Sequence, residues 1–460
     1  MAGKTGTSQV GAQLTVSHTG SLSGANELYH ALFDRLGIIQ VDSPSQLIET
    51  LKFLCISGVP KGNKVMGFTC SGGGATMLAD YAEKVGLEFI QPTPETAEVL
   101  REQLPAIATV SNPLDYTTPI WGQQPVEAVI TTACSDQHHA AIIVQDYPLP
   151  GLDETKNYYF NDTKAFVNAT KAASLPAAVC CTLQENLDEE TRDYLVSVGV
   201  TPAQGIHEAL DAIAAAVWYG KRRLEILDFP PLKLVKRIDK AGKPICLDEY
   251  EGKQILKAAG IAVPAGQLAN SDDAATIADE VGYPLVLKMV SAKLAHKTEA
   301  GAVKLNLQSA QQVSAAIEAM QTAVLEYDRD AVTDQYLLEP MVPNAITELM
   351  VSIRYDEQFG LAMTIASGGI FIELIADAVT LILPTTQHEI LKALDQLKIA
   401  KLLDGFRGKP AANQQALATE LLNLAEFMAA HVDEITEVEI NPLFVLEDGV
   451  CAVDVLMQRI

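Results

Sequence analysis

Short apolar segments alternate with amphipathic segments through the first half of the chain, and this alternation limits the possible fold more than any other feature. A helix that crosses back over a sheet makes the next strand parallel to the one before, so repeated alternation predicts a doubly wound α/β domain. We expect strands at 64–70, 140–144 and 177–181 and helices at 75–85, 161–173, 189–198 and 206–218.

The second half follows a different order, in which strands come in groups. This order predicts an α+β fold with a mostly antiparallel sheet. We expect helices at 248–259, 389–397 and 411–430 and strands at 285–289, 302–307, 335–339, 347–354, 361–365, 379–383, 437–440 and 451–455. Residues 221–243 are basic, contain prolines and show little periodicity, so we interpret them as a linker; a segment that clasps an acidic face is the alternative.

An excess of acidic residues narrows the possible ligands. The 58 Asp and Glu residues outnumber the 33 Lys and Arg residues, which leaves a formal net charge of −25. Such a field repels phosphate backbones, so we expect no nucleic-acid partner. An anionic ligand must then be bound by local positive groups, such as a helix N-terminus, a lysine in the site or a divalent cation.

The expected location follows from three further features. No apolar run approaches the ~20 residues that span a bilayer, so we expect no membrane partner. The seven cysteines show no CxxC spacing, which favours buried thiols in a reducing compartment. The first residues carry no apolar secretion signal. We therefore expect a cytoplasmic protein.

A histidine surrounded by small residues is the first candidate for chemistry. His18 lies in the sequence Ser-His-Thr-Gly-Ser, just before a predicted helical stretch at 27–36. Small neighbours leave the imidazole reachable, and a neutral imidazole can accept a phosphoryl group and pass it on. The alternative is a polar cap at the entry of the helix.

A glycine-rich loop joins the strand at 64–70 to the helix that follows it. Ser71, Gly72, Gly73 and Gly74 would let backbone N–H groups approach an anion, and the helix dipole favours negative charge there. A tight turn that binds nothing is the alternative.

A third cluster lies at a predicted strand end, where doubly wound sheets open into a ligand crevice. Asn112, Asp115, Tyr116 and Trp121 supply an amide, a carboxylate and two aromatic rings for a substrate. The rings could hold a substrate bulkier than acetate or one with an onium group. A hydrophobic lid or ordinary packing is the alternative.

The second half carries residues that suit a nucleotide and its metal ion. Lys288 ends an apolar strand, where a point charge suits phosphates, and His296 follows in a glycine-containing loop. Glu339 ends another apolar strand, and Glu348 lies at the start of the next. Hard oxygen ligands for Mg²⁺ come from two adjacent predicted strands, and they are Glu439, Asn441 and Asp454. Taken singly, a Lys or a Glu here could be a surface ion pair.

In this order, the motifs resemble those of the NDP-forming acyl-CoA synthetases, the superfamily of succinyl-CoA synthetase and ADP-forming acetyl-CoA synthetase. The resemblance covers nearly the whole chain and is strongest at 17–21, 285–297, 367–371 and 439–443. It implies flavodoxin-like (succinyl-CoA synthetase-like) domains followed by an α+β ATP-grasp module. The implied domains are a partial phosphohistidine domain at 1–58, a flavodoxin-like domain at 59–220, the linker at 221–243 and the ATP-grasp domain at 244–460.

The resemblance also implies an activity and roles. A carboxylate, ATP and CoA would give acyl-CoA, ADP and phosphate through an acyl phosphate and a phosphohistidine. His18 would carry the phosphoryl group, and His296 would relay it near the nucleotide. The loop at 71–74 would cradle the phosphate. The resemblance assigns ATP to Lys288, Glu339 and Glu348, and Mg²⁺ to Asn441, Asp454 and Glu439.

One part of the family pattern is not found in this sequence. Members carry a CoA-binding domain before the phosphohistidine motif, together with a glutamate that faces the histidine. We therefore expect a fragment, or a homo-oligomer or partner chain that supplies the CoA-binding part.

Two other classes of function stay open. A carboxylate–amine ligase of the ATP-grasp type would explain residues 244–460 and leave His18 idle. A non-catalytic regulatory subunit would keep the fold and bind nucleotide or acyl-CoA.

Overall fold

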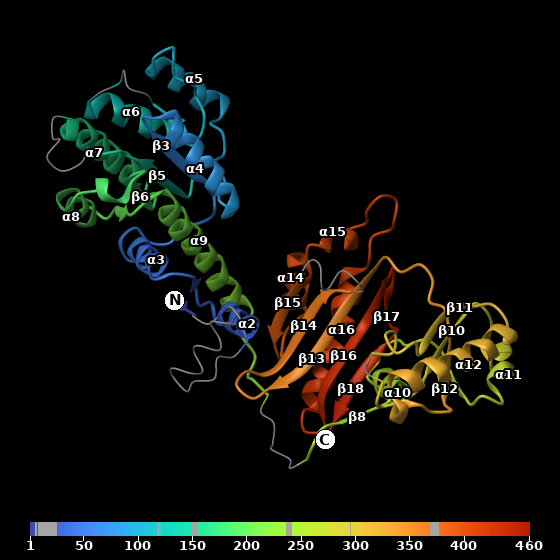
Figure 1. The fold of residues 1–460 in the computed structure, drawn as a ribbon. Coiled ribbons are helices and arrows are strands. Elements are labelled where there is room, and N and C mark those ends of the chain that lie inside the picture. The colour runs from blue at the N-terminus through green and yellow to red at the C-terminus, as the bar shows by residue number, and fades with distance from the viewer. Residues whose placement is uncertain are drawn as a thin grey trace. The chain divides into compact units, whose positions relative to one another are not determined.

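The computed structural model describes residues 1–4, 7, 25–116, 120, 122–148, 155–235, 242–294, 296–368 and 377–460. The chain divides into two compact units (Figure 1). Unit 1 comprises Met1–Ser23 and Phe33–Pro230, and unit 2 comprises Gly24–Leu32 and Pro231–Ile460. Among the described residues, no helix has the length and hydropathy that a membrane crossing requires.

Unit 1 is built on a five-stranded sheet in which every pair of neighbours is parallel, in the order β4-β3-β5-β6-β7. The strands are β3 (Val65–Thr69), β4 (Leu114–Asp115), β5 (Ala140–Val144), β6 (Ala177–Cys180) and β7 (Thr201–Ala203). This confirms the predicted parallel α/β fold. A separate parallel pair joins β1 (Ala2–Gly3) to β2 (Gln40–Val41).

Helices cover both faces of this sheet because successive strand residues point to opposite sides. Met66 and Phe68 pack against one set of helices, whereas Val65 and Ile142 pack against the other. The helices are α3 (Pro44–Ile56), α4 (Gly72–Lys84), α5 (Pro94–Gln103), α6 (Gln123–Ala133), α7 (Lys156–Ala172), α8 (Glu189–Ser197) and α9 (Ile206–Asp228), with a 3-10 turn η2 (Gln184–Asn186).

The helices of unit 1 differ from the sequence-based expectation in two ways. The helix α9 continues to Asp228, so residues 221–228 are helical and the linker interpretation was wrong for them. The reason is that Arg222 continues the buried face of this helix, where its guanidinium pairs with Asp34 at 3.3 Å. The helices α3, α5 and α6 were not predicted.

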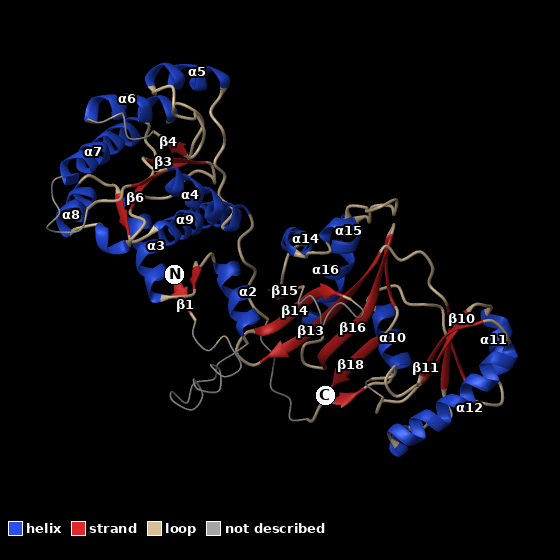
Figure 2. Cartoon of the chain, turned by 45° about the horizontal axis from the view of Figure 1, so that its top comes forward, coloured by secondary structure: helices blue, strands red, loops and turns tan. Residues whose placement is uncertain are grey.

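Unit 2 contains two antiparallel sheets, which confirms the predicted α+β order. The smaller sheet has the order β11-β10-β12-β9. Its strands are β9 (Gln267–Ala269), β10 (Leu285–Met289), β11 (Val303–Leu307) and β12 (Tyr336–Pro340). The helices α11 (Ala274–Val281) and α12 (Ala310–Tyr327) pack along it and bury its apolar residues (Figure 2).

The larger sheet has the order β15-β14-β13-β16-β18-β8, with β17 paired to β16. Its strands are β8 (Ile245–Cys246), β13 (Thr347–Asp356), β14 (Gly360–Ser367), β15 (Ala378–Ile382), β16 (Ile435–Leu446), β17 (Gly449–Ala452) and β18 (Val455–Arg459). The remaining elements of the unit are α10 (Glu249–Ala258), the 3-10 turn η3 (Arg329–Ala331), α14 (Gln387–Gln396), α15 (Ala400–Leu403) and α16 (Gln414–Ala430). The first part of α2 (Asn26–Leu36) packs through Leu28 on Phe359 and Ile382.

The predicted strand at 451–455 is in fact two strands. β17 ends at Ala452 and β18 begins at Val455, so Val453 and Asp454 form the link between them. The expectation that Asp454 lies on a strand was therefore wrong. The two strands pair with different parts of β16, because Leu443 lies opposite Ala452 whereas Ile440 lies opposite Val455.

Candidate functional site

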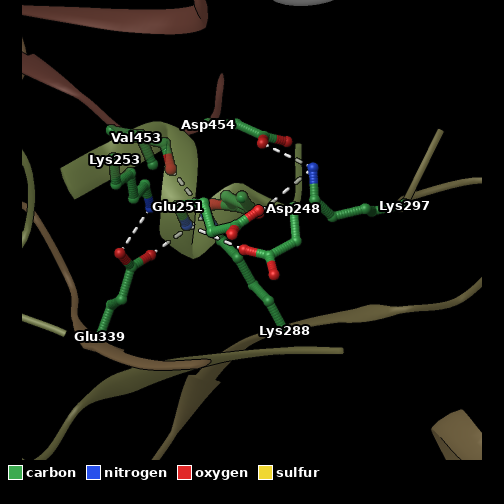
Figure 3. A network of polar contacts seen from close by, with 9 residues as sticks. Asp248, Glu251, Lys253, Lys288, Lys297, Glu339, Val453 and Asp454 are labelled. Atoms are coloured by element: carbon green, nitrogen blue, oxygen red, sulfur yellow. Dashed lines mark hydrogen bonds and ion pairs between the residues drawn. The ribbon is translucent and has the colours of Figure 1, made fainter. Parts of the chain in front are cut away.

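Three lysines and three carboxylates of unit 2 form a buried ionic cluster (Figure 3). Its members come from α10, β10, β12, the loop after β10 and the link between β17 and β18. We call the following six residues the lysine cluster: Glu249, Lys253, Lys288, Lys297, Glu339 and Asp454. Their side chains are at most 8% exposed, except for that of Asp454, which is 31% exposed.

Lys288 lies at the centre of these contacts. Its Nζ is 2.5 Å from Oε1 of Glu249 and 3.1 Å from Oε2 of Glu339. It also donates a hydrogen bond to the carbonyl of Val453 at 2.6 Å. The structure therefore brings together Lys288 and Glu339, which the sequence analysis assigned to one site.

The other two lysines complete the cluster. Lys253 Nζ lies 2.8 Å from Oε1 of Glu249 and 2.5 Å from Oε1 of Glu339. Lys297 Nζ lies 2.7 Å from Oδ1 of Asp454 and 3.2 Å from Oε2 of Glu249. The sequence analysis did not select Glu249, Lys253 or Lys297. A usable signal was the i, i+4 spacing of Glu249 and Lys253 in a predicted helix, which places both side chains on one face.

Local structure explains why these side chains meet. Val286 lies opposite Glu339 in the pairing of β10 with β12, and Lys288 is two residues farther along, so Lys288 and Glu339 leave the sheet on the same face. The helix α10 starts at Glu249 because Asp248 caps it, with its Oδ1 accepting a hydrogen bond from the Glu251 N–H at 2.8 Å. Gly266 makes room for Glu339, since a Cβ there would lie 2.8 Å from Cγ of Glu339.

Glu249 and Lys288 stabilise each other's charged forms, whereas burial and the nearby charge of Lys288 lower the pKa of Lys253. Burial alone would raise the pKa of Glu249, but the three lysine charges outweigh it and hold the pKa well below its usual range. Burial would lower the pKa of Lys288, but the charges of Glu249 and Glu339 raise it instead. A buried cation stays charged only when it is paired in this way. The cluster therefore keeps ammonium groups ready for an anion inside a desolvated site.

The predicted Mg²⁺ ligands lie next to this cluster. The Asn441 N–H donates to the carbonyl of Asp454 at 3.2 Å, and Glu439 pairs with Leu456 on β18. Burial, followed by the charge of Glu249, raises the pKa of Asp454; burial, followed by the charge of Glu437, raises that of Glu439. A nearby cation stabilises the ionised form of a carboxylate whose pKa is raised. The oxygen donors therefore fit Mg²⁺ with bound phosphates. Among the described residues, no group of three or more His, Cys, Asp or Glu is arranged to hold a metal ion by itself.

His296 and Glu348 are exposed, unlike most residues of the lysine cluster. His296 is exposed and near enough to Glu439 to oppose, in small part, the rise in the pKa of Glu439 that burial and Glu437 cause, so it lies beside the predicted Mg²⁺ ligands. Glu348 is exposed at the start of β13, in contrast to the buried cluster. Its carbonyl accepts a hydrogen bond from Gly368 at 2.8 Å, where a Cβ would lie 2.8 Å from the carbonyl carbon of Glu348.

The glycine loop of unit 1 starts a helix as predicted. β3 ends at Thr69, Ser71 is the N-cap, and α4 begins at Gly72. Asp115 lies beside this start, because its Oδ2 is 3.6 Å from where a Cβ on Gly72 would be. The structure therefore brings Asp115 to Ser71, Gly72, Gly73 and Gly74 at the carboxyl edge of the sheet.

Two residues predicted to contact a substrate are instead part of the interior. The side-chain carbonyl of Asn112 accepts from Gly67 N–H at 3.0 Å, and its amide donates to the carbonyls of Val65 and Ile90 at 2.8 and 2.9 Å. Tyr116 is 1% exposed, and its ring packs in the core between the sheet and its helices. Both side chains are therefore engaged in the interior of the domain, and their contact with a substrate stays a prediction.

Other predicted residues lie outside the described part of the chain. They are His18 and Trp121, together with positions 369–371 of the loop after β14.

Comparisons with known proteins match both units. The ATP-grasp domain family matches residues 240–458, and the succinyl-CoA ligase like flavodoxin domain matches residues 1–54. Acetate–CoA ligase [ADP-forming] I of Archaeoglobus fulgidus is 30% identical over 99% of this chain and 65% of its own length. The 4-hydroxybutyrate–CoA ligase [ADP-forming] of Nitrosopumilus maritimus is 27% identical over 97% of this chain and 64% of its own length.

A third relative matches the second half alone. Acetate–CoA ligase [ADP-forming] I subunit beta of Pyrococcus furiosus is 33% identical over 49% of this chain and 96% of its own length. The chain thus spans 65% and 64% of the two relatives that it matches along nearly its whole length.

Proposed function

Because this chain belongs to the ADP-forming acyl-CoA ligase family, we propose that it acts as an acid–thiol ligase. A carboxylate, ATP and CoA would give acyl-CoA, ADP and phosphate. The observation that carries the proposal is the lysine cluster, which includes Asp454, together with the neighbouring oxygen donors Asn441 and Glu439. Buried ammonium groups next to hard oxygen ligands suit the phosphates of a nucleotide and its Mg²⁺.

The proposed reaction assigns a role to each part of the chain. Lys288 and Lys253 hold the polyphosphate, with Glu339 orienting both ammonium groups. The γ-phosphoryl group passes to His18 with release of ADP, and His296 lies at the nucleotide as a relay. The phosphoryl group then passes from His18 to the carboxylate, and the thiolate of CoA attacks the acyl carbon and releases phosphate. The N-terminus of α4 cradles the phosphate.

The proposal leaves the acid unnamed. The burial of Tyr116 removes the support for a bulky or onium-bearing substrate, so only the class, a small carboxylic acid, is proposed. CoA and the acid are the proposed partners. The cytoplasmic location stays a prediction from the sequence. So does the assembly, which is either a homo-oligomer or a complex with a partner chain that supplies a CoA-binding part.

Phosphoryl transfer from labelled ATP tests the proposal. With ATP labelled at the γ-phosphate and Mg²⁺, we expect acid-labile label on the wild type and its loss in His18→Ala and Lys288→Ala. His207→Ala is the matched control, because His207 is an exposed histidine in unit 1 and should leave the labelling unchanged. Equal labelling of His18→Ala and wild type would overturn the phosphohistidine step.

A second measurement separates the proposed reaction from the other classes of function. ADP release in the presence of carboxylates should increase with CoA. An increase with an amine but not with CoA would indicate a carboxylate–amine ligase. A lack of thermal stabilisation by Mg²⁺ and ATP would instead favour a subunit that does not use nucleotide.

A further inference from the structure

We propose that Glu249 is a positioning residue of the nucleotide site in addition to Glu339, and that its carboxylate holds three lysine ammonium groups in place for a polyphosphate. This inference rests on the proposed nucleotide binding. None of the sequence motifs pointed to Glu249, and its role emerges only from the contacts of the folded unit.

Glu249 is the one member of the lysine cluster whose carboxylate reaches all three lysines in the described structure. Its Oε1 lies 2.8 Å from Lys253 and 2.5 Å from Lys288. Its Oε2 lies 3.2 Å from the ammonium of Lys297. By comparison, Glu339 pairs with two of the lysines and Asp454 with one. Glu249 thus links a helix, a strand and a loop through one carboxylate.

Electrostatics make this link necessary. Three ammonium groups in a buried space repel one another, and each also loses its hydration. Glu249 has a side chain that is 1% exposed, so little solvent screens its attraction to the lysines. Without that charge, the three lysines would move apart or lose protons, and the spacing that suits neighbouring phosphates would be lost.

The backbone of Glu249 is held firmly enough for this task. It is the first residue of α10, directly after the capping Asp248, and the N-terminus of a helix favours a carboxylate. Gly252 lets the helix approach β18 closely, since a Cβ there would lie 3.0 Å from Cγ1 of Val455. The carboxylate therefore has a fixed origin from which to position the lysines.

The cluster also has an accessible side. Exposure increases from Glu249, at 1%, to Asp454, at 31%. Oε2 of Glu249 is paired with Lys297 at 3.2 Å, so a polyphosphate, which is itself an acceptor, would bind the ammonium groups and not this carboxylate. A nucleotide polyphosphate that enters beside Asp454 would contact Lys297 first. Glu249 would meanwhile hold the ammonium groups of Lys253 and Lys288 in position deeper in the site.

Charge-neutral and shortened variants of Glu249 test the inference. Binding of Mg²⁺ with the non-hydrolysable analogue AMPPNP would be measured by calorimetry on the full chain, after the fold has been checked by circular dichroism. Glu249→Gln should weaken binding at least tenfold, and it should raise KM for ATP by a larger factor than it lowers kcat. Glu249→Asp, which keeps the charge, should bind more tightly than Glu249→Gln and at least threefold more weakly than wild type.

A matched control separates this effect from the loss of any buried carboxylate. Glu49 is 2% exposed and pairs with Lys52 at 2.8 Å in unit 1, so Glu49→Gln should bind AMPPNP as wild type does. Binding by Glu249→Gln within twofold of wild type would overturn the inference. If Glu249→Gln does not fold, wild-type binding by Glu249→Asp would overturn it. A wild-type protein that binds no AMPPNP would instead overturn the proposed function.

Discussion

At the scale of single residues, two buried carboxylates show that the neighbours of a group decide its chemistry. Glu249 stays ionised because three lysines surround it. Asp162 of α7 is 0% exposed, and its Oδ2 accepts a hydrogen bond from the Tyr116 hydroxyl at 3.1 Å. In the described part of the chain, its Oδ1 accepts none. Burial raises the pKa of Asp162 to about 7, although the hydrogen bond from Tyr116 opposes this.

The raised pKa of Asp162 predicts a pH-dependent stability for unit 1. The folded state binds this proton more tightly than the unfolded state, so the free energy of unfolding should fall as pH rises from about 4 to about 7 and then level off. The loss between pH 5 and pH 8 is on the order of 2 kcal/mol. Asp162→Asn should remove it, because its amide is neutral at both values.

Urea unfolding of wild type and Asp162→Asn at the two pH values measures this difference. The variant should be the more stable protein at pH 8, and the two should be nearly equal at pH 5. A wild type that gains stability relative to the variant between pH 5 and pH 8 would show that Asp162 is ionised in the folded state.

At the scale of elements, the start of α4 depends on how closely the helix approaches β3. A Cβ on Gly74 would lie 2.6 Å from Oγ1 of Thr69, whereas a Cβ on Gly73 would meet only Oγ of Ser71 at 3.6 Å. Oγ1 of Thr69 in turn accepts a hydrogen bond from the Ser71 N–H at 3.2 Å. Gly74 therefore sets the close contact, and Gly73 leaves a free surface on the helix.

Substitution of these two glycines by alanine should have different effects on the free energy of unfolding. Gly74→Ala should lower the free energy of unfolding by about 1–3 kcal/mol, because Thr69 or the helix must shift. Gly73→Ala should leave it unchanged or raise it by up to about 1 kcal/mol, since alanine favours a helix over glycine. Denaturant titration of both variants measures the two changes in the free energy of unfolding. Equal losses in both would mean that the approach of α4 to Thr69 is not the cause.

At the scale of the whole molecule, each unit has its own hydrophobic cores. Those of unit 1 lie on the two faces of the parallel sheet. Those of unit 2 lie between the larger sheet and α10, α14 and α16, and between the smaller sheet and α11 and α12. The lysine cluster belongs to unit 2 alone. A ligand that binds it should therefore stabilise one unit directly.

Scanning calorimetry should resolve this as two transitions with different responses to nucleotide. Mg²⁺ with AMPPNP at about 100 times its Kd should stabilise the transition of unit 2 by about 2.7 kcal/mol. The transition of unit 1 should stay where it is. Lys288→Ala should abolish the shift and identify the transition that belongs to unit 2. A shift of both transitions by the same amount would contradict the assignment of the nucleotide to unit 2.

Local structure and family membership could be predicted from the order of the amino acids. Periodicity is a property of neighbouring residues, so it predicted the strands at Ala140–Val144 and Leu285–Met289 and both fold classes. The family resemblance also assigned Lys288 and Glu339 to one nucleotide site, and the strand pattern placed Asn441 and Asp454 near each other on neighbouring parts of the sheet.

Which side chains are buried together depends on contacts that form when the chain folds. Lys253 and Glu339 are 86 positions apart, and Lys297 and Asp454 are 157 apart, so no local pattern reports their ion pairs. The residues next to Tyr116 in the sequence are of types that are typical of a binding site, yet the folded domain buries Tyr116 in its core. Glu249 is an ordinary helix residue until three lysines from different elements surround it. Burial and long-range charge arise only when the chain has folded, and they decide the chemistry of these groups.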